Sequence, residues 1–278
     1  MAITVYARRN FKGDDVTGFD LDNFRQIAHP IIPTSVRLTG ANDKILFFTH
    51  VKWGGRAMFR SGVQEIANLG HPGDGGAIGF ENTITGMRVT PFTLKLRFHV
   101  VTDASGAFPG GMTLLTQVEQ MVDNMLLGAN TVWNPRLIRF VLESVVLPSG
   151  VSQFFDMDHE FYKLMVHSRK FDRLKGGANV VLVNQVAPDL GGHAIAHSLS
   201  HMVLVDARQF DDGLTLAHEL GHFFSLLHRD HKAPNLMDHD IVNAGLSTTQ
   251  VTLTNEQIEN AHESFANFSL LEKGVRVE

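Results

Sequence analysis

Residues 217–228 read Ala-His-Glu-Leu-Gly-His-Phe-Phe-Ser-Leu-Leu-His, and this stretch decides how the larger part of the chain folds. His218 and His222 are four residues apart, so on a helix both imidazoles lie on one face and can point at a single atom. Glu219 lies about 100° farther around the helix, beside that point but not at it. A core helix would bury these polar groups to no purpose, at a high cost in free energy. The spacing therefore predicts a metal site built on a helix.

A third histidine extends the pattern. His228 follows His222 by six residues, so the helix must end and the chain must turn near Ser225. The arrangement H-E-x-x-H-x-x-G-x-x-H resembles the metzincin clan of zinc peptidases, with Ser225 where glycine is usual. Serine adopts the left-handed angle of that turn only at a cost. The resemblance implies that His218, His222 and His228 hold one catalytic Zn²⁺ ion, and that Glu219 is the general base for a metal-activated water.

The same resemblance assigns roles to two further segments. Met237 is interpreted as the methionine of a Met-turn that packs beneath the zinc histidines, the alternative being a core filler. His239 stands where some members of the clan have a tyrosine. It could ligate zinc, hydrogen-bond an oxyanion or face solvent. The resemblance also implies an edge strand at Ala194, Ile195 and Ala196, along which an extended peptide substrate would pair.

Three more histidines precede the motif at intervals of four, His193, His197 and His201. On a helix this spacing would form a second metal site. The preceding pair Gly191-Gly192 and the β-branched residues that follow favour extended chain instead, so both alternatives stay open.

The composition excludes several classes of protein. The chain of 278 residues has no cysteine, so disulfides, thiolate metal sites and a cysteine nucleophile are absent. Eight of its 15 histidines lie between His193 and His239. A net charge of −5 argues against nucleic-acid binding. No apolar run approaches the roughly 18 residues of a membrane span. No secretory signal is visible at the N-terminus, which leaves a leaderless route or a cytoplasmic location as the alternatives.

The first ninety residues contain a repeat. Tyr6-x4-Phe11-x-Gly13 is followed 42 residues later by Phe48-x4-Trp53-x-Gly55, and the two units precede the similar stretches 34–38 and 85–89. Two aromatic residues that flank a turn with a glycine indicate a folded hairpin. This pattern resembles the Greek-key motif of the βγ-crystallin superfamily, in which two copies make one two-sheet sandwich. Gly86 stands where that motif has a serine.

Many microbial members of that superfamily bind calcium just before this serine. The corresponding stretch 30–33 reads Pro-Ile-Ile-Pro and offers no ligands, and 81–85 reads Glu-Asn-Thr-Ile-Thr. Calcium is therefore kept only as an alternative cofactor. We expect the module to bind a surface or partner, or to act as an inhibitory segment.

From residue 93 the pattern changes to strands alternating with helices. Period-two alternation predicts a strand over 92–101, and an apolar stripe predicts a helix over 114–125. Further strands are expected at 137–146, 179–183 and 201–205, and Thr254-x-x-Gln257 is a capping box that predicts a helix to about Phe268. The expected fold class is α+β. An all-β Greek-key sandwich over 1–92 precedes a zincin-like α/β catalytic domain over 93–278, with a mixed sheet and an active-site helix.

Together these features predict a zinc-dependent endopeptidase acting on a protein or peptide substrate. Two alternatives remain. One is a non-catalytic binding protein with a structural zinc site, and the other is a peptidase toxin with a single narrow target.

Overall fold

A computed structural model of the chain describes residues 3–8, 12–15, 35–49, 56–66, 69, 86–157, 171–174, 176–186, 195–197, 202–208, 213–228 and 234–271. The chain forms two compact units. The first comprises Met1–Pro91 and Thr254–Leu271, and among the described residues the second is Phe92–Leu253. The second unit therefore interrupts the first. We expected everything after residue 92 to form one domain, but Thr254–Leu271 belongs to the first unit, because this helix packs on a strand there.

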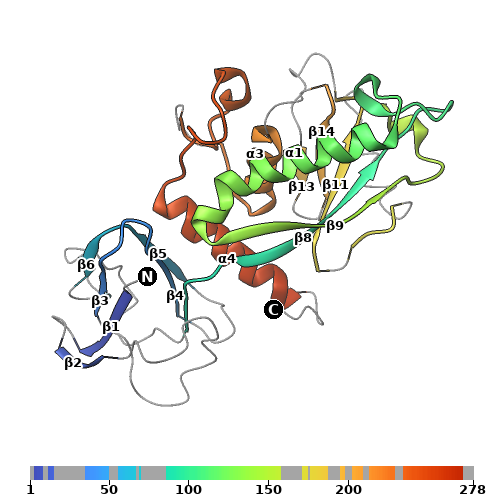
Figure 1. Ribbon diagram of the computed structural model, residues 1–278. Coiled ribbons are helices and arrows are strands. Elements are labelled where there is room, and N and C mark those ends of the chain that lie inside the picture. The colour runs from blue at the N-terminus through green and yellow to red at the C-terminus, as the bar shows by residue number, and fades with distance from the viewer. Residues whose placement is uncertain are drawn as a thin grey trace. The chain divides into compact units, whose positions relative to one another are not determined.

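The first unit contains two antiparallel sheets (Figure 1). One has the order β2-β1-β3-β6, formed by Lys12–Asp15, Ile3–Arg8, Ser35–Leu38 and Gln64–Ile66. The other has the order β5-β4-β7, formed by Ala57–Ser61, Lys44–Phe48 and Gly86–Arg88. Strand β6 follows β5 in the chain but pairs with β3 in the opposite sheet. This crossing between sheets is a Greek-key type of connection.

The two copies of the sequence repeat also pair their strands in the same register. Tyr6 in β1 lies opposite Ser35 in β3, and Phe48 in β4 lies opposite Gly86 in β7. The first aromatic residue of each copy thus faces the serine position of its own copy, across an antiparallel ladder. The residues Phe11, Trp53 and Gly55 and the stretches 30–33 and 81–85 lie outside the described residues.

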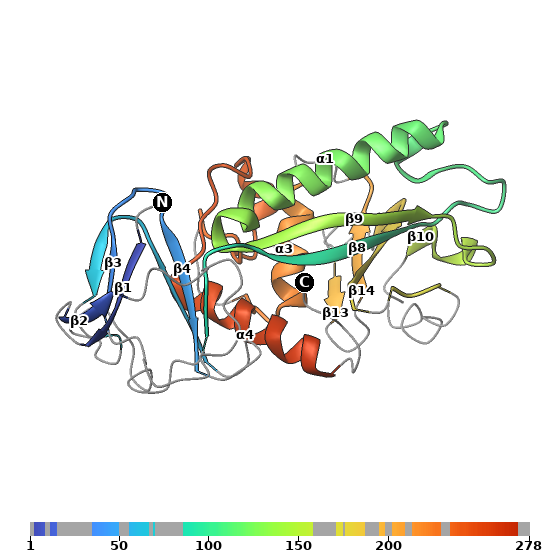
Figure 2. The ribbon, with the colours of Figure 1, turned by 60° about the horizontal axis from the view of Figure 1, so that its bottom comes forward.

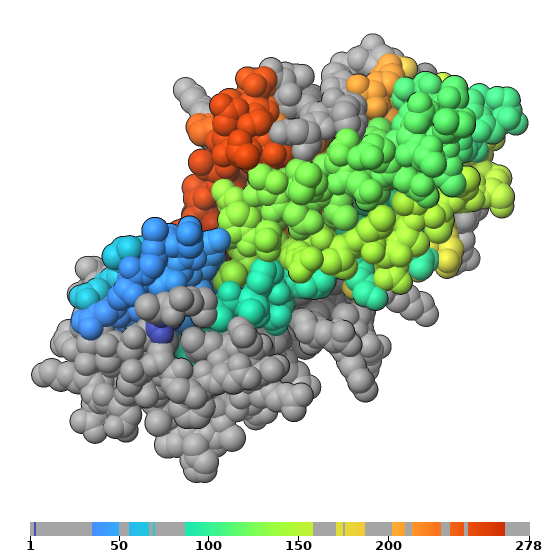
Figure 3. All heavy atoms as spheres, viewed as in Figure 1, coloured from blue at the N-terminus to red at the C-terminus, as the bar shows by residue number. Residues whose placement is uncertain are grey.

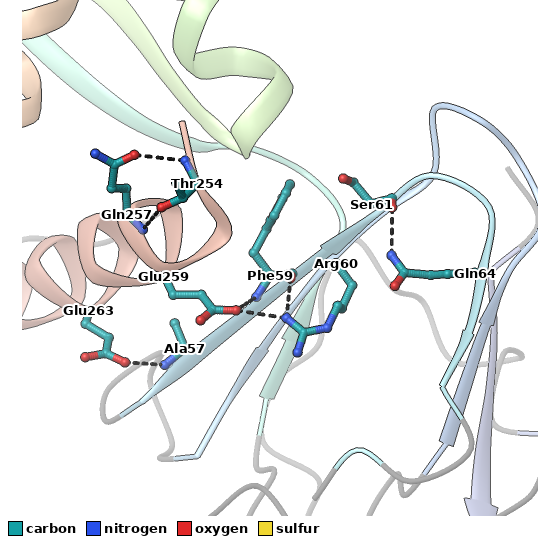
Figure 4. Close-up of polar contacts among 9 residues, drawn as sticks. All are labelled: Ala57, Phe59, Arg60, Ser61, Gln64, Thr254, Gln257, Glu259 and Glu263. Atoms are coloured by element: carbon teal, nitrogen blue, oxygen red, sulfur yellow. Dashed lines mark hydrogen bonds and ion pairs between the residues drawn. The ribbon is translucent and has the colours of Figure 1, made fainter. Parts of the chain in front are cut away.

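The first unit is completed by α4, Asn255–Leu271. The predicted capping box is confirmed: the Thr254 N–H donates to Gln257 Oε1 at 2.8 Å, and the Gln257 N–H donates to Thr254 Oγ1 at 3.2 Å (Figure 4). These bonds satisfy backbone donors that the first turn leaves open, so the helix begins sharply after Thr254.

The second unit is built on a mixed five-stranded sheet of order β13-β14-β11-β8-β9. Its strands are Ile195–His197, Met202–Asp206, Ala178–Val183, Phe92–Val100 and Ile138–Val146. Four of them are parallel, and β13 is antiparallel to β14 at the edge. A two-stranded parallel ribbon pairs β10, Asp156–Met157, with β12, Gln185–Val186. In the part of the chain that the structure describes, short 3₁₀ helices lie between these elements at Pro109–Gly111, Asn134–Arg136, Ser152–Phe154 and Ile241–Ala244.

Among the described residues of the second unit, helices α1 and α3 cover its sheet (Figures 1 and 2). Helix α1, Leu115–Trp133, packs on β9, and α3, Leu214–Phe223, packs on β13 and β14. The two helices also pack on each other, so they share one face of the sheet. Helix α1 runs eight residues beyond the predicted end because Ala129, Val132 and Trp133 continue its buried stripe. The space-filling view shows its outer side beside β9 (Figure 3).

A buried apolar cluster of the second unit is formed by Val101, Val151, Phe154, Met157, Phe171, Val181, Val183, Val186, Met202 and Leu204. Within the described residues, no helix is long and apolar enough to cross a membrane.

Candidate metal centre

Three imidazoles converge where α3 ends. The Nε2 atom of His228 lies 2.8 Å from Nε2 of His218 and 2.9 Å from Nε2 of His222. His218 and His222 come from successive turns of α3, and His228 comes from the segment that follows the helix. Among the described residues, these three form a group that could hold a metal ion.

Backbone carbonyls fix the orientation of two of the rings. His218 Nδ1 lies 2.6 Å from the Leu236 carbonyl oxygen, and His222 Nδ1 lies 2.7 Å from that of Leu226. A carbonyl can only accept, so both Nδ1 atoms carry the proton. In a neutral imidazole this leaves an Nε2 lone pair. Two such lone pairs point at one place, together with Nε2 of His228, and this donor set fits a zinc ion.

The protonation of His222 also suits a metal ligand. Burial lowers the pKa of His222 below its ordinary value, and the hydrogen bond to the Leu226 carbonyl only partly opposes this. The neutral ring is therefore favoured, and neutral imidazole is the form that binds metal.

Glu219 lies beside the three imidazoles without joining them. Its side chain is 3% exposed, and Oε1 lies 3.9 Å from His218 Nε2. This is the offset expected for adjacent residues on one helix. A buried carboxylate at this distance can exchange a proton with a group bound at the convergence point.

The turn after α3 depends on Ser225. Its φ is 64°, in the left-handed region, as expected from the sequence. The Leu226 N–H donates to the Gly221 carbonyl at 3.0 Å and the Ser225 N–H to the His222 carbonyl at 2.8 Å, which is a Schellman motif. The turn brings the Leu226 carbonyl back onto His222 and redirects the chain towards His228.

Met237 lies beneath the helix, in a turn held by Asn235. Met237 is fully buried, and its N–H donates to Asn235 Oδ1 at 2.9 Å. A Cβ placed on Gly221 would overlap Met237 Sδ, so the bare backbone of this glycine admits the methionine. No role for Gly221 was predicted from the sequence. The signal that could have pointed to it is its place in a helix interior, where glycine costs about 1 kcal/mol relative to alanine.

His239 lies at the rim of the site. Its ring centroid is 5.3 Å from that of His228, and its Nδ1 is 3.2 Å from Asp240 Oδ1. The side chain is 68% exposed. The structure therefore places His239 beside the three imidazoles but outside their group.

The expected edge strand is present as β13. Ile195 and Ala196 pair with Leu204 and Val203 of β14, and β13 is the terminal strand of the sheet. His197 lies in this extended segment, which agrees with the extended alternative and not with the helical one. Ala194, His193 and His201 lie outside the described residues.

No protein-family model and no curated protein matches the chain. Two solved structures that match are βγ-crystallin domains. One is described as "Evolution of the eye lens beta-gamma-crystallin domain fold", with 19% identity, 31% of this chain and 81% of that chain covered, and a TM-score of 0.24. The other is a "beta gamma crystallin from Ciona Intestinalis", with 13% identity, 32% and 98% covered, and a TM-score of 0.23. At these scores the likeness assigns no function to the chain.

Proposed function

We propose that the second unit is a zinc-dependent endopeptidase of the metzincin type. The observation that carries this proposal is the convergence of the three Nε2 atoms of His218, His222 and His228, two of them oriented by backbone carbonyls. Three imidazole ligands with one position left open are the arrangement of a catalytic zinc rather than a structural one.

Glu219 supplies the acid–base chemistry in this proposal. When bound, a zinc ion provides Lewis acidity to a water molecule and to the scissile carbonyl. Glu219 takes the proton released as the carbonyl is attacked and later delivers it to the departing amine nitrogen. Its burial and its 3.9 Å separation from His218 Nε2 support this role. A structural zinc site has no need of such a carboxylate.

The substrate in this proposal is an extended peptide that pairs with the edge strand around Ala194, Ile195 and Ala196. Strand β13 supports this because it ends the sheet and packs on α3, the helix that carries His218 and His222. Backbone hydrogen bonds along such an edge bind peptides with little dependence on sequence.

We further infer that the first unit is a βγ-crystallin-like Greek-key domain. The crossing of β6 between the sheets and the matched positions Tyr6–Ser35 and Phe48–Gly86 support it.

The test is metal content and proteolysis of the full chain, with casein and gelatin as substrates and with and without a chelator. We expect about one zinc per chain and cleavage that the chelator abolishes. Glu219→Gln should retain zinc and lose at least about 100-fold in turnover. Full proteolysis by that variant would contradict the proposed role of Glu219. Zinc binding without any cleavage would favour a structural site or a single narrow target.

A further inference from the structure

The turn that carries Met237 is closed twice by Asn235. The Asp238 N–H donates to the Asn235 carbonyl at 3.1 Å, which makes residues 235–238 a β-turn. The Met237 N–H donates to the side-chain oxygen Oδ1 of Asn235 at 2.9 Å. An asparagine that binds the backbone two residues farther on forms an Asx-turn. Asn235 is buried, with 7% of its surface exposed, so this bond lies inside the protein.

The side-chain bond of Asn235 and the hydrogen bond of His218 act on the same peptide group. The peptide bond between Leu236 and Met237 carries the Leu236 carbonyl at one end and the Met237 N–H at the other. The carbonyl accepts from His218 Nδ1 at 2.6 Å, and the N–H donates to Asn235 Oδ1. Because a trans peptide is planar, its C=O and N–H point in opposite directions, and holding one fixes the other. Asn235 Oδ1 therefore sets the direction in which the Leu236 carbonyl meets His218.

The backbone on either side of Asn235 is held by Thr252. The Thr252 N–H donates to the Pro234 carbonyl at 2.7 Å, and the Leu236 N–H donates to the Thr252 carbonyl at 2.8 Å. Asn235 and Thr252 lie opposite each other in a short parallel bridge. All of these residues belong to the second unit. The main chain of the turn thus has an anchor of its own, so we expect the turn to persist when the Asn235 side chain is shortened.

The two hydrogen bonds of this peptide group also strengthen each other. His218 Nδ1 donates to the Leu236 carbonyl, and the N–H of the same peptide group donates to Asn235. Hydrogen bonds in such a chain polarise one another by about 10–30% per bond. Leu236 and Met237 are fully buried, where water does not weaken this effect. A stronger acceptor at Nδ1 makes Nε2 more basic, and Nε2 is the nitrogen that would bind metal.

We propose that Asn235 is a positioning residue of the metal centre: through the peptide bond between Leu236 and Met237, its side-chain oxygen holds the ring of His218 toward His222 and His228. This role rests on the proposed function, in which the three histidines hold zinc. Without the Oδ1 acceptor, the buried Met237 N–H must remain unpaired at a cost in free energy or rotate to another partner. Rotation of the peptide group carries the Leu236 carbonyl away from His218 Nδ1.

The test uses the full chain prepared without metal, and its first readout is zinc affinity by competition with a chromophoric chelator. Asn235→Ala removes the acceptor oxygen. Loss of a group that orients a metal ligand weakens metal binding by about 10-fold or more, and we expect this loss here. Asn235→Ser keeps a neutral oxygen that can accept from the same N–H, so it should recover part of the affinity.

Asn130→Ala is the matched control. Asn130 in α1 holds the backbone of β9 with the same kind of side chain: Oδ1 accepts from the Phe140 N–H at 2.8 Å, and Nδ2 donates to the Phe140 carbonyl at 2.9 Å. Both alanine variants should lower the urea midpoint of the metal-free chain by roughly 0.5–1 M. Only Asn235→Ala should weaken zinc binding. The comparison thus separates the orientation of His218 from stability in general.

The second readout requires no metal. The proton between His218 Nδ1 and the Leu236 carbonyl should give a downfield, slowly exchanging signal in the proton NMR spectrum of the wild-type chain. Its loss in His218→Gln assigns it. We expect Asn235→Ala to move this signal upfield and to speed its exchange with water, and Asn130→Ala to leave it unchanged.

The outcomes test the role of Asn235 and the proposed function separately. Wild-type zinc affinity with an unshifted signal in Asn235→Ala would overturn the role of Asn235, and so would an equal loss of affinity in Asn235→Ala and Asn130→Ala. A wild-type chain that binds no zinc would overturn the proposed function instead, and the NMR signal would then judge the contact of Asn235 alone. If Asn235→Ala does not fold, Asn235→Ser gives the same two readouts.

Discussion

Ser225 holds the backbone angle on which the geometry of the site depends. A left-handed residue with a Cβ costs about 1–2 kcal/mol, and glycine avoids this cost while losing about 0.5–1 kcal/mol of unfolded-state entropy. Ser225→Gly should therefore raise the free energy of unfolding by about 0.5–1 kcal/mol, measured by urea unfolding. Ser225→Ala, which keeps a Cβ, is the control and should give no gain. A loss of stability in the glycine variant would show that the serine hydroxyl makes a contact worth more than the strain.

Gly221 is fixed by the methionine beneath it. Alanine favours a helix interior by about 1 kcal/mol. The new Cβ would overlap the buried Met237 side chain, and overpacking costs about 1–3 kcal/mol. We expect Gly221→Ala to lower the thermal unfolding temperature and to weaken zinc binding. Adding Met237→Ala should cost less in this variant than in the wild type, and purely additive effects in that double-mutant cycle would argue against the contact.

These residues also show which features of the site could be predicted from the sequence alone and which could not. The spacing of His218, His222 and His228 was sufficient to predict that they meet, because helix periodicity and one forced turn leave few other arrangements. The carbonyls of Leu226 and Leu236 that orient two of the rings could not be predicted. Backbone groups carry no side-chain signal, and Leu236 is remote from His218 in the chain.

At the scale of elements, the start of α4 can be tested directly through its capping residue. Thr254→Ala removes the hydroxyl that accepts the Gln257 N–H, and loss of such a cap costs about 1 kcal/mol. We expect the first unit to lose this amount in chemical unfolding. Thr254→Ser, which keeps the oxygen, should remain within a few tenths of a kcal/mol of the wild type. An equal loss in both variants would indicate that the methyl group, and not the hydrogen bond, matters.

The strands of the second unit were predictable from period-two alternation and apolar runs, as in β8, β9, β11 and β14. The end of α1 was predicted eight residues too early, because the small residues Gly128 and Ala129 continue its buried stripe before Val132 and Trp133. Gly213 is an example of a feature that could not be predicted from the sequence. It precedes α3 with a φ of 92°, and a Cβ there would lie 2.5 Å from the Met125 carbonyl oxygen. Such a close approach of two helices has no local signature.

At the scale of the whole molecule, buried ionisable groups set how stability depends on pH. His99 is fully buried in β8, with Nε2 3.1 Å from Asn179 Oδ1 and its ring edge-on to Phe171. Burial lowers the pKa of His99, the nearby Arg97 lowers it further, and the hydrogen bond to Asn179 and the charge of Asp172 oppose this only in part.

The sign of the effect follows from proton binding. Below pH about 6.5 the unfolded chain protonates this histidine while the folded chain does not. Stability is therefore fully present above that pH and falls as the pH drops towards the folded-state pKa, with a limiting slope of about 1.4 kcal/mol per pH unit. Unfolding by urea between pH 4.5 and 7.5 should show this slope flattened in His99→Gln relative to the wild type. Parallel profiles for the two proteins would rule out His99 as its source.

The domain division was predicted near residue 92 and the structure changes at Pro91, but the return of Thr254–Leu271 to the first unit could not be foreseen. A change of pattern along the chain marks where one unit begins. It carries no information on which distant strand a final helix will cover, and the pairing of Glu259 and Glu263 with β5 joins residues about two hundred positions apart.

The sequence by itself determined the three converging histidines, the adjacent glutamate, the duplicated hairpin pattern and most strands, because each depends on the local periods of helix and strand. Only the tertiary structure decided which carbonyls orient the rings, that Met237 packs against the bare backbone of Gly221 and which unit α4 belongs to. Those features depend on contacts between segments far apart in the chain, and such contacts are set by packing rather than by any local pattern.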